Sequence, residues 1–428
     1  MKKSFGKKVL AVLLAGALAL PLIGCGGIKS KDLMKDIEKS AGNDMDCTQD
    51  IGVTEYNHET TLDFSVRLLQ NSMASTPEEE KGENVLISPI SILAALAMTA
   101  NGAKGETLTQ MEQVFGVNMD SLNEEMSAYI TSSNQLKEIQ LNIANSIWFK
   151  NDDSLMVNQD FLQKNADYYE ASVYAADFDE STLKDINRWV DENTDGMIKE
   201  ILKQIPADAV MYLINAVAFD AKWQEQYTED AIHEKVFTKE DGTKQTVEFM
   251  FSEENIYLES ENATGFMKNY KGGDYAFVAI LPNEGINIEE YIASLDGESL
   301  YELLSNREKT VVNTFTPKFE TEYDIELSKA LEAMGMVDVF YGNKADLTGV
   351  GTSNAGNLFV SRVLHKTYIC VDENGTKAGA ATAVEIDCES ALADPPKQVY
   401  LNRPFVYMIM DTETYKPLFI GTMMSVEE

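Results

Sequence analysis

Few residues in this chain are of the types that most often carry catalysis. The 428 residues include three histidines, His58, His233 and His365. There is no Gly-x-Ser-x-Gly, His-Glu-x-x-His or Walker motif, and no Gly-x-Gly-x-x-Gly follows a strand pattern. Carboxylate pairs carry no signal, because the chain has 70 acidic residues. His365 lies in a strand-like run, where a buried, hydrogen-bonded histidine is expected rather than a base. The chain is therefore predicted to be no enzyme and to need no metal or cofactor.

Cys25 has neighbours that specify a covalent modification. Four lysines, at positions 2, 3, 7 and 8, precede an apolar stretch from residue 9 to residue 23. Fifteen helical residues span roughly 22 Å, less than a hydrocarbon core of about 30 Å, so the stretch has the length of an export signal. Leu22-Ile23-Gly24-Cys25 fits the site at which bacterial lipoproteins are cleaved and acylated on sulfur. An ordinary signal peptide with a chance cysteine is the alternative.

The segment from Thr376 to Asp387 alternates in character. Its even-numbered residues are small or apolar: Thr376, Ala378, Ala380, Thr382, Val384 and Ile386. Its odd-numbered residues hold every charge: Lys377, Gly379, Ala381, Ala383, Glu385 and Asp387. Because strand side chains alternate between two faces, the segment could form a half-buried strand. Yet Gly375 precedes it and the acidic stretch 387–396 follows it, which is typical of an exposed loop. Alternation alone leaves both interpretations open.

The remaining elements indicate an α+β fold. Amphipathic or capped patterns predict helices at 60–70, 88–101, 106–115, 183–191 and 324–334. Apolar runs predict strands at 209–219, 275–281, 405–410 and 418–424, the first two of them buried on both faces. Helices early and strands late are typical of α+β proteins.

Composition divides the chain into three parts. Residues 1–24 are the expected signal peptide, 25–55 a polar, lipid-anchored tether with room for a short helix near 31–38, and 56–428 one domain. Without residues 1–24 the chain has 31 basic and 70 acidic residues, a net charge near −39. That charge excludes nucleic acid as a partner and leaves the lipid to hold the protein at the membrane, extracytoplasmic in the cell envelope. Cys47, Cys370 and Cys388 form an odd set, so no disulfide framework is expected.

Residues 373–381, Glu-Asn-Gly-Thr-Lys-Ala-Gly-Ala-Ala, resemble the proximal hinge of an inhibitory serpin. Further serpin-like motifs follow the family's order along the chain: Asn84-Val85-Leu86-Ile87-Ser88-Pro89-Ile90-Ser91, Asn215 to Lys222-Trp223, Ala345-Asp346-Leu347-Thr348-Gly349, Leu364-His365-Lys366 and Asn402-Arg403-Pro404-Phe405. The similarity spans about Tyr56 to Ser425. Asn374 departs from the charged residue that is common at its position.

The resemblance implies the serpin fold, a single domain of three β-sheets with eight or nine helices and an exposed reactive-centre loop. It implies a "shutter" beneath the central sheet, formed by Ser88, Ser91, Asn215 and His365, and a "breach" at Trp223, where loop insertion begins. The implied hinge residues are Glu373, Gly375, Thr376, Ala378, Gly379, Ala380 and Ala381. Thr376 and Ala380 are both expected in or beside the exposed loop of the native state.

The resemblance also implies a suicide inhibitor that traps an acylated serine protease in a covalent 1:1 complex. The usual spacing from Glu373 gives Glu389–Ser390 as the cleaved bond, with Ala391, Leu392 and Ala393 as alternatives. No lysine or arginine lies between Lys377 and Lys397, which favours elastase-like or subtilisin-like targets over trypsin-like ones. A glutamate-selective enzyme would suit Glu389, and cysteine proteases stay open. The alternative function is a non-inhibitory, serpin-fold surface binding protein, whose hinge usually carries bulky, charged or proline residues.

Overall fold

The computed structural model describes residues 28–40, 58–77, 81–152, 154–376 and 395–426. The nine α-helices in this part are α1 (His58–Ser75), α2 (Pro89–Ala100), α3 (Gly105–Phe115), α4 (Met119–Ser133), α5 (Gln159–Tyr169), α6 (Glu180–Asn193), α7 (Ile288–Ser294), α8 (Gly297–Ser305) and α9 (Ser328–Met334). The described strands form three sheets, so the predicted α+β fold with three sheets and eight or nine helices is confirmed.

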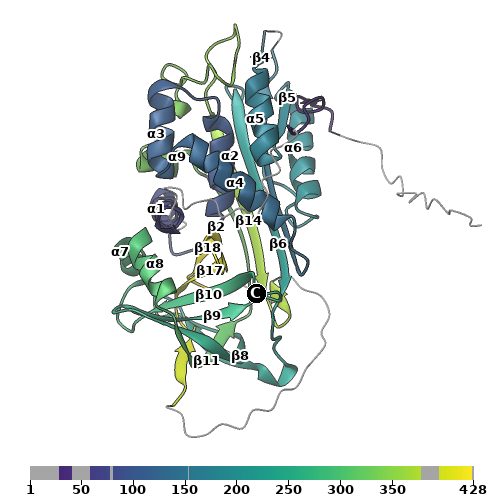
Figure 1. The fold of residues 1–428 in the computed structure, drawn as a ribbon. Helices are drawn as coiled ribbons and strands as arrows, with labels where there is room; N and C mark the ends of the chain where they lie inside the picture. The colour runs from purple at the N-terminus through teal and green to yellow at the C-terminus, as the bar shows by residue number, and fades with distance from the viewer. Residues whose placement is uncertain (1–27, 41–57, 78–80, 153, 377–394, 427–428) are drawn as a thin grey trace, which may run out of the picture.

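The central sheet has seven strands, and Figure 1 shows its long strands running through the molecule. In spatial order they are β1 (Lys31–Asp32), β5 (Ser172–Ala176), β3 (Ile139–Lys150), β6 (Met211–Lys222), β15 (Gly375–Thr376), β14 (Arg362–Val371) and β12 (Phe319–Glu326). At one end β6 pairs directly with β14, in parallel, over residues 212–216. At the other end β15 lies between these two strands. We call the boundary between β6 and β14 the seam of the central sheet. The seam is closed where β6 and β14 pair directly, and it is open at the end where β15 lies between them.

The second sheet has nine strands and packs across the end of the molecule at which β15 lies (Figure 1). Its path is β16 (Lys397–Tyr400), β11 (Glu308–Pro317), β8 (Lys244–Glu259), β9 (Ala263–Asn269), β10 (Tyr275–Pro282), β17 (Phe405–Asp411), β18 (Pro417–Met423) and β2 (Val85–Ile87), with β7 (Ile232–Thr238) on β8. The third sheet pairs β4 (Met156–Val157) with β13 (Gly351–Thr352).

Apolar side chains are buried on both faces of β6, as the run at 209–219 predicted. Odd-numbered residues such as Leu213 and Val217 belong to the main core. Even-numbered residues such as Tyr212 and Ile214 pack with Ile186 and Trp189 of α6 in a second core. Helix α2 is buried along its whole length and contacts β3, β6 and β18, so it lies between the two large sheets. Any widening of the central sheet therefore involves both α2 and α6.

Residues 28–40 dock on the outer edge of the central sheet. Lys31 and Asp32 pair antiparallel with β5, and the backbone N–H of Leu33 donates to the carbonyl of Val173 at 2.9 Å. The short helix expected near 31–38 is wrong, because this segment begins with strand β1 and contains no helix. The expected tether thus begins with a segment that binds the domain, and residues 41–57 lie outside the described part.

Most predicted elements are found, with shifted ends. The helix predicted at 324–334 is wrong in its first turn, because residues 324–326 end strand β12 and α9 begins at Ser328.

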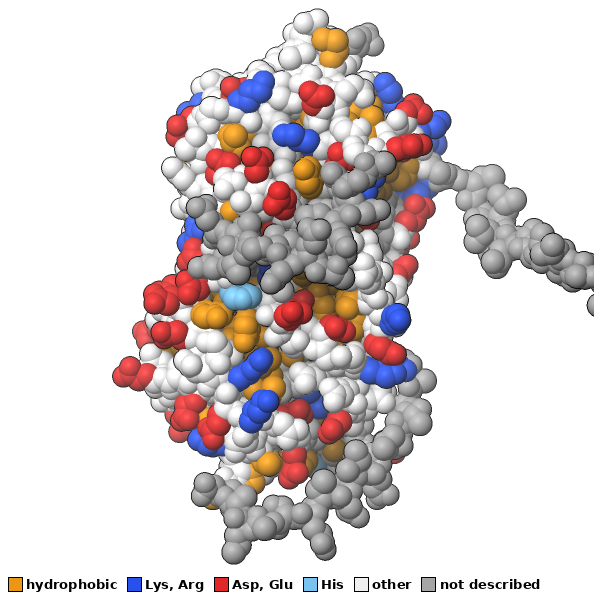
Figure 2. Space-filling view, viewed as in Figure 1, with side chains coloured by type: hydrophobic (Ala, Val, Ile, Leu, Met, Phe, Trp, Pro, Cys, Tyr) orange, Lys and Arg blue, Asp and Glu red, His pale blue; other side chains and the backbone are white. Residues whose placement is uncertain are grey.

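No helix among the described residues is long and apolar enough to cross a membrane. Acidic side chains outnumber basic ones over much of the face drawn in Figure 2, in keeping with a net charge of −35 for the full chain.

Candidate functional site

Two hinge residues, Gly375 and Thr376, already form a strand of the central sheet, β15. They pair with Lys222 and Ala221 of β6, and Thr376 also pairs with Val371 of β14. Thr376 is 1 % exposed, and its hydroxyl lies 2.6 Å from that of Tyr270. Thr376 itself is therefore not in an exposed loop, and the residues after it, beside which it was expected to lie, are outside the described part of the chain. These two residues lie between β6 and β14 at one end of the sheet.

Gly375 is required by close backbone contact. A Cβ atom at this position would lie 2.1 Å from the carbonyl oxygen of Ala221 and 2.8 Å from the Cα of Lys222. Both contacts are with backbone atoms, which cannot rotate away. The glycine of the hinge motif is thus explained by the entry of the hinge between two strands.

Residues 223–227 hold the backbone of residues 372–374, where the hinge begins. The Trp223 backbone N–H donates to the carbonyl of Asn374 at 3.0 Å, and its indole Nε1–H donates to that of Asp372 at 2.8 Å. The Tyr227 N–H donates to the carbonyl of Glu373 at 3.0 Å, and Gln226 Nε2 donates to that of Asn374 at 3.1 Å. Trp223, predicted at the breach, therefore lies where the hinge enters the sheet.

A buried ion pair lies next to the rings of Trp223 and Tyr227. Lys268 Nζ lies 2.7 Å from Glu254 Oε1, and both residues are buried. The same ammonium lies 4.4 Å from the ring centre of Tyr227 and 5.6 Å from that of Trp223, distances at which a cation is attracted to an aromatic face. Trp223 also stacks on Tyr270, with ring centres 4.5 Å apart. Sequence analysis missed Lys268 and Tyr270, which lie in or next to β9 with no motif around them.

Glu373 is fixed by a second lysine that sequence analysis missed. Lys318 Nζ lies 2.8 Å from Glu373 and 3.1 Å from Glu248. The hydrogen bond from Lys318 lowers the pKa of the Glu373 carboxyl below its usual value. Lys318 lies between β11 of the second sheet and β12 of the central sheet. Its ion pair with Glu373 therefore joins the start of the hinge to both large sheets.

The four predicted shutter residues meet beneath the closed part of the seam. His365 accepts the backbone N–H of Ser88 on Nε2 at 3.0 Å, which leaves the ring proton on Nδ1. Nδ1–H then donates to Oδ1 of Asn215 at 2.7 Å. The Asn215 amide nitrogen donates to Ser91 Oγ and, at 2.6 Å, to Oδ1 of Asn145. The chain of hydrogen bonds therefore joins α2, β14, β6 and β3.

Burial sets the protonation of this network. His365 is 1 % exposed, and desolvation lowers its pKa to about 3. A proton on Nε2 would also break the hydrogen bond from Ser88. Ser88 occupies the N-cap position of α2, but its hydroxyl makes no capping bond and contributes nothing to the network. Asn145 was missed because β3 also holds Gln140, Asn142 and Ser146, so nothing in the sequence distinguishes this amide.

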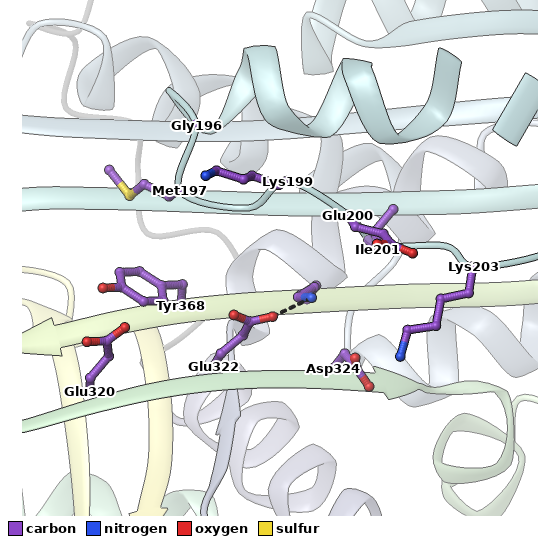
Figure 3. A pocket seen from close by; sticks show the side chains of 11 residues that line it. Gly196, Met197, Lys199, Glu200, Ile201, Lys203, Glu320, Glu322, Asp324 and Tyr368 are labelled. Atoms are coloured by element: carbon purple, nitrogen blue, oxygen red, sulfur yellow. Dashed lines mark ion pairs between the residues drawn. The ribbon is translucent and has the colours of Figure 1, made fainter. Parts of the chain in front are cut away.

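An open hollow separates the segment after α6 from β12 and β14 (Figure 3). Its volume is about 660 Å³. It is lined by Gly196, Met197, Lys199, Glu200, Ile201, Lys203, Glu320, Glu322, Asp324, Lys366 and Tyr368. Glu322 and Lys366 form an ion pair at 2.5 Å across neighbouring strands. The hollow leaves room beside the seam on the face that α6 covers.

Several predicted site residues lie outside the described part of the chain: Cys25, Ala378, Gly379, Ala380, Ala381, Glu389, Ser390, Ala391, Leu392 and Ala393. Their predicted roles stay predictions. Cys370 is a half-buried free thiol. Among the described residues, no three histidine, cysteine or acidic side chains are placed to hold a metal ion.

Comparison with known proteins finds chains of similar sequence and structure. A family model described as "Serpin (serine protease inhibitor)" matches residues 59–426. Human neuroserpin is 29% identical over 389 residues, which are 87% of this chain and 92% of that protein. The thermophilic serpin tengpin in its native state is 46% identical with a TM-score of 0.85, covering 93% of this chain and 100% of that one. Thyroxine-binding globulin in complex with thyroxine is 26% identical with a TM-score of 0.76, covering 87% and 99%.

Proposed function

The chain belongs to the serpin family, and from that membership we propose that it inhibits a serine-type protease as a suicide substrate. The protease serine attacks the carbonyl carbon of the residue before the cleaved bond. The peptide bond breaks, its nitrogen leaves with a proton, and the protease is held as an ester on the N-terminal fragment. The freed segment then inserts into the central sheet and carries the acylated protease away before water can release it.

The observation that carries this proposal is the position of β15. Gly375 and Thr376 occupy one end of the boundary between β6 and β14, and at the other end residues 212–216 of β6 pair directly with β14. A strand that continued from Thr376 would pair with both neighbours and add backbone hydrogen bonds along its length. The entry to the seam is thus already occupied by the residues that would lead insertion.

The register of β15 gives each loop residue a partner on β6. Continued antiparallel from the pair Thr376–Ala221, it brings Ala380 opposite Val217, Val384 opposite Leu213 and Ile386 opposite Met211. These β6 residues face the main core, so the small and apolar even-numbered residues match the space they would enter. Burial of Val384 and Ile386 would contribute roughly 3–6 kcal/mol.

The same register accounts for the one polar residue in the middle of the inserting face. Thr382 would lie opposite Asn215, the centre of the shutter network. His365 and Asn215 are paired neighbours while the seam is closed, and an inserted strand would separate them. A threonine hydroxyl arriving there can replace a hydrogen bond that the separation removes.

The odd-numbered residues would meet the α6 side of the sheet. Lys377 would lie opposite Asp220, an oppositely charged partner, and Ala383 opposite Ile214, beneath α6. In such an inserted strand only part of this face would lie outside α6. Lys377 remains on the polar part.

We further propose that Cys25 is acylated and holds the inhibitor at the outer side of a membrane. Elastase-like or subtilisin-like proteases are the proposed targets, because the loop from 378 to 396 has no basic residue. The proposed cleaved bond is Glu389–Ser390, with the bonds near Ala391, Leu392 and Ala393 as alternatives.

A denaturing gel tests the proposed inhibition. The purified domain is incubated with an elastase-like protease, and a band at the summed mass of protease and N-terminal fragment is expected to survive boiling in SDS. The same protease with its serine blocked is the control and should give no such band. Cleavage without a stable band for every protease tried would favour the non-inhibitory alternative, of which the thyroxine complex of thyroxine-binding globulin is an example within the fold.

A further inference from the structure

One row of the central sheet joins the N-terminal segment to the far end of β6. Lys31 pairs with Ala175, Ala175 with Phe149 and Phe149 with Met211. The hinge enters at the other end of β6, beside Ala221 and Lys222. These ends are ten residues apart, roughly 33 Å at the rise of a strand. In Figure 1 the segment 28–40 lies beside β5 and α6, at the end of the sheet opposite β15.

Complete insertion would bring the cleaved loop into this row. With the register of β15, residue 386 arrives opposite Met211, and Glu389 would lie just beyond the end of β6. Lys31 is four strands away in the same row, about 19 Å at 4.8 Å per strand. A protease of about 230 residues has a radius of gyration of about 17 Å, so its body would extend to the edge at which residues 28–40 dock.

The proposed lipid anchor lies at the same end. Ile28 packs against the core that α6 forms with β6. Cys25 precedes it by three residues, which span at most about 11 Å. While residues 28–40 are docked, the membrane surface therefore lies close to this end and the loop is presented at the opposite one. Complete insertion would bring the protease into the space between the sheet and the lipid, which is too narrow for it.

We infer that residues 28–40 are a releasable clasp, which must leave the sheet edge before a membrane-anchored copy can complete insertion. The inference rests on the proposed function. A flexible chain of 32 residues, the number from 26 to 57, has an average span of roughly 30 Å and a far greater maximum reach. That length lets the domain turn away from the membrane.

The clasp is held by both apolar and polar contacts, and release must break both: Ile28, Leu33, Met34 and Ile37 pack against the two cores. Beyond the two residue pairs of β1, the backbone N–H groups of Lys29 and Ser30 and the Ser30 hydroxyl all donate to Oδ2 of Asp185, each at 2.8 Å. Ser40 donates to Asp167 from its backbone N–H at 2.7 Å and from its hydroxyl at 3.0 Å. Asp185 is 3 % exposed and lies on α6, so the clasp covers a carboxylate that water would solvate after release.

Hydrogen exchange on two forms of the protein tests the clasp. One form starts at residue 26 and is free in solution. The other has Cys25 coupled to a maleimide phospholipid in phosphatidylcholine vesicles, and both carry serine in place of Cys47, Cys370 and Cys388. In the anchored complex with elastase, the amides of Ser30 and Leu33 are expected to lose protection at least tenfold relative to the anchored native protein. In the soluble complex they should keep it.

Asp185→Asn gives a second readout. The amide that replaces the carboxylate is a poorer acceptor for three donors, so the anchored variant is expected to form complex several-fold faster than the anchored wild type. The soluble variant should match the soluble wild type, and Glu192→Gln on the same helix is the control. Protection that persists in the anchored complex overturns the clasp, as does equal loss in the soluble complex, which would tie release to sheet widening alone. A soluble form that gives no stable complex refutes the proposed function instead.

Discussion

The hydroxyl groups of Thr376 and Tyr270 lie 2.6 Å apart inside the molecule, between the two large sheets. This contact fixes how far the hinge has entered the central sheet before any cleavage. Thr376 is committed to the core, whereas the residues after it lie outside the described part of the chain. Substitutions on either side of this point should therefore behave differently.

Ala380→Arg is expected to turn the inhibitor into a substrate without lowering its native stability. The arginine would have to enter the core opposite Val217, and an unpaired buried charge costs several kcal/mol. Slower insertion gives the acyl-enzyme time to hydrolyse, so cut protein and active protease should both accumulate. Thr376→Arg should do the same and also lower the native free energy of unfolding by several kcal/mol, since Thr376 is already buried. The number of inhibitor molecules consumed per protease, with thermal unfolding, checks both.

Lys377→Arg is the control for these variants and should inhibit normally. It keeps the charge that would face Asp220. An Ala380→Arg protein that formed complex at an unchanged stoichiometry would contradict insertion of the even-numbered face.

Gly375→Ala is expected to push the hinge out of the sheet. The added Cβ would meet the Ala221 carbonyl oxygen at 2.1 Å, and neither strand can yield without breaking its pairing. The native protein should then lose the contact between Thr376 and Tyr270, and amide exchange at Lys222 and Trp223 should rise at least tenfold. Gly273→Ala, at a site with open space around its Cβ but a positive φ, is a stability control that leaves the hinge untouched. Unchanged exchange in Gly375→Ala would show that the seam widens more easily than the close contact implies.

The C-terminal fragment released by an inhibited elastase-like protease is expected to begin at Ser390. This follows from the usual spacing from Glu373, and mass spectrometry of the fragment measures it directly. A fragment beginning at Leu392, Ala393 or Asp394 would move the reactive bond to one of the alternatives at Ala391, Leu392 or Ala393.

Trypsin-like proteases are expected to be poor targets. Their primary pocket requires a cation, and the loop has no lysine or arginine between Lys377 and Lys397. An elastase-like enzyme should be inhibited at least a hundredfold faster than trypsin in matched progress curves. Leu392→Arg tests the same point in reverse, because the arginine supplies the cation that the primary pocket of trypsin requires. Stoichiometric inhibition of trypsin by the wild-type loop would contradict the proposed specificity.

Acid is expected to destabilise the protein partly through His365. Its pKa falls from 6.5 in the unfolded chain to about 3 in the native protein, because burial disfavours the charged ring. Between these values the unfolded state binds more protons, so this contribution is complete above pH 6.5 and is lost as the pH falls toward 3. The slope is at most about 1.4 kcal/mol per pH unit. The stability difference between wild type and His365→Gln should therefore shrink between pH 7 and pH 5. A difference that stays constant would show that His365 can be protonated without loss of the fold.

The sequence predicted the parts of this site that depend on local patterns. The alternation that begins at Thr376 follows from the period of a strand, and His365 in an apolar run indicated a buried ring. Lys318 and Asn145 were missed because no motif surrounds either residue and their partners lie tens of residues away. The helix at 324–334 began too early because the alternating, half-exposed end of β12 joins α9 without a clear break.

The clasp could not be predicted for a related reason. Lys31 and Asp32 have no strand pattern of their own, and their pairing exists only because β5 presents a free sheet edge at Tyr174 and Ala175. Asp185 binds the clasp through one carboxylate on a helix rich in acids, which nothing in its neighbours distinguishes. Contacts of this kind depend on the folded edge and not on the segment that binds it.

The half-open seam also determines how such an inhibitor is used up. An inserted strand would pair with the ten residues of β6 from Asp220 to Met211, and with β14 on its other side. Its withdrawal would require all of these rows to separate at once, with the cut ends of the loop no longer joined. Under the proposed mechanism each molecule would act once, and protection against the protease would be set by the number of inhibitor molecules and their rate of replacement, not by affinity.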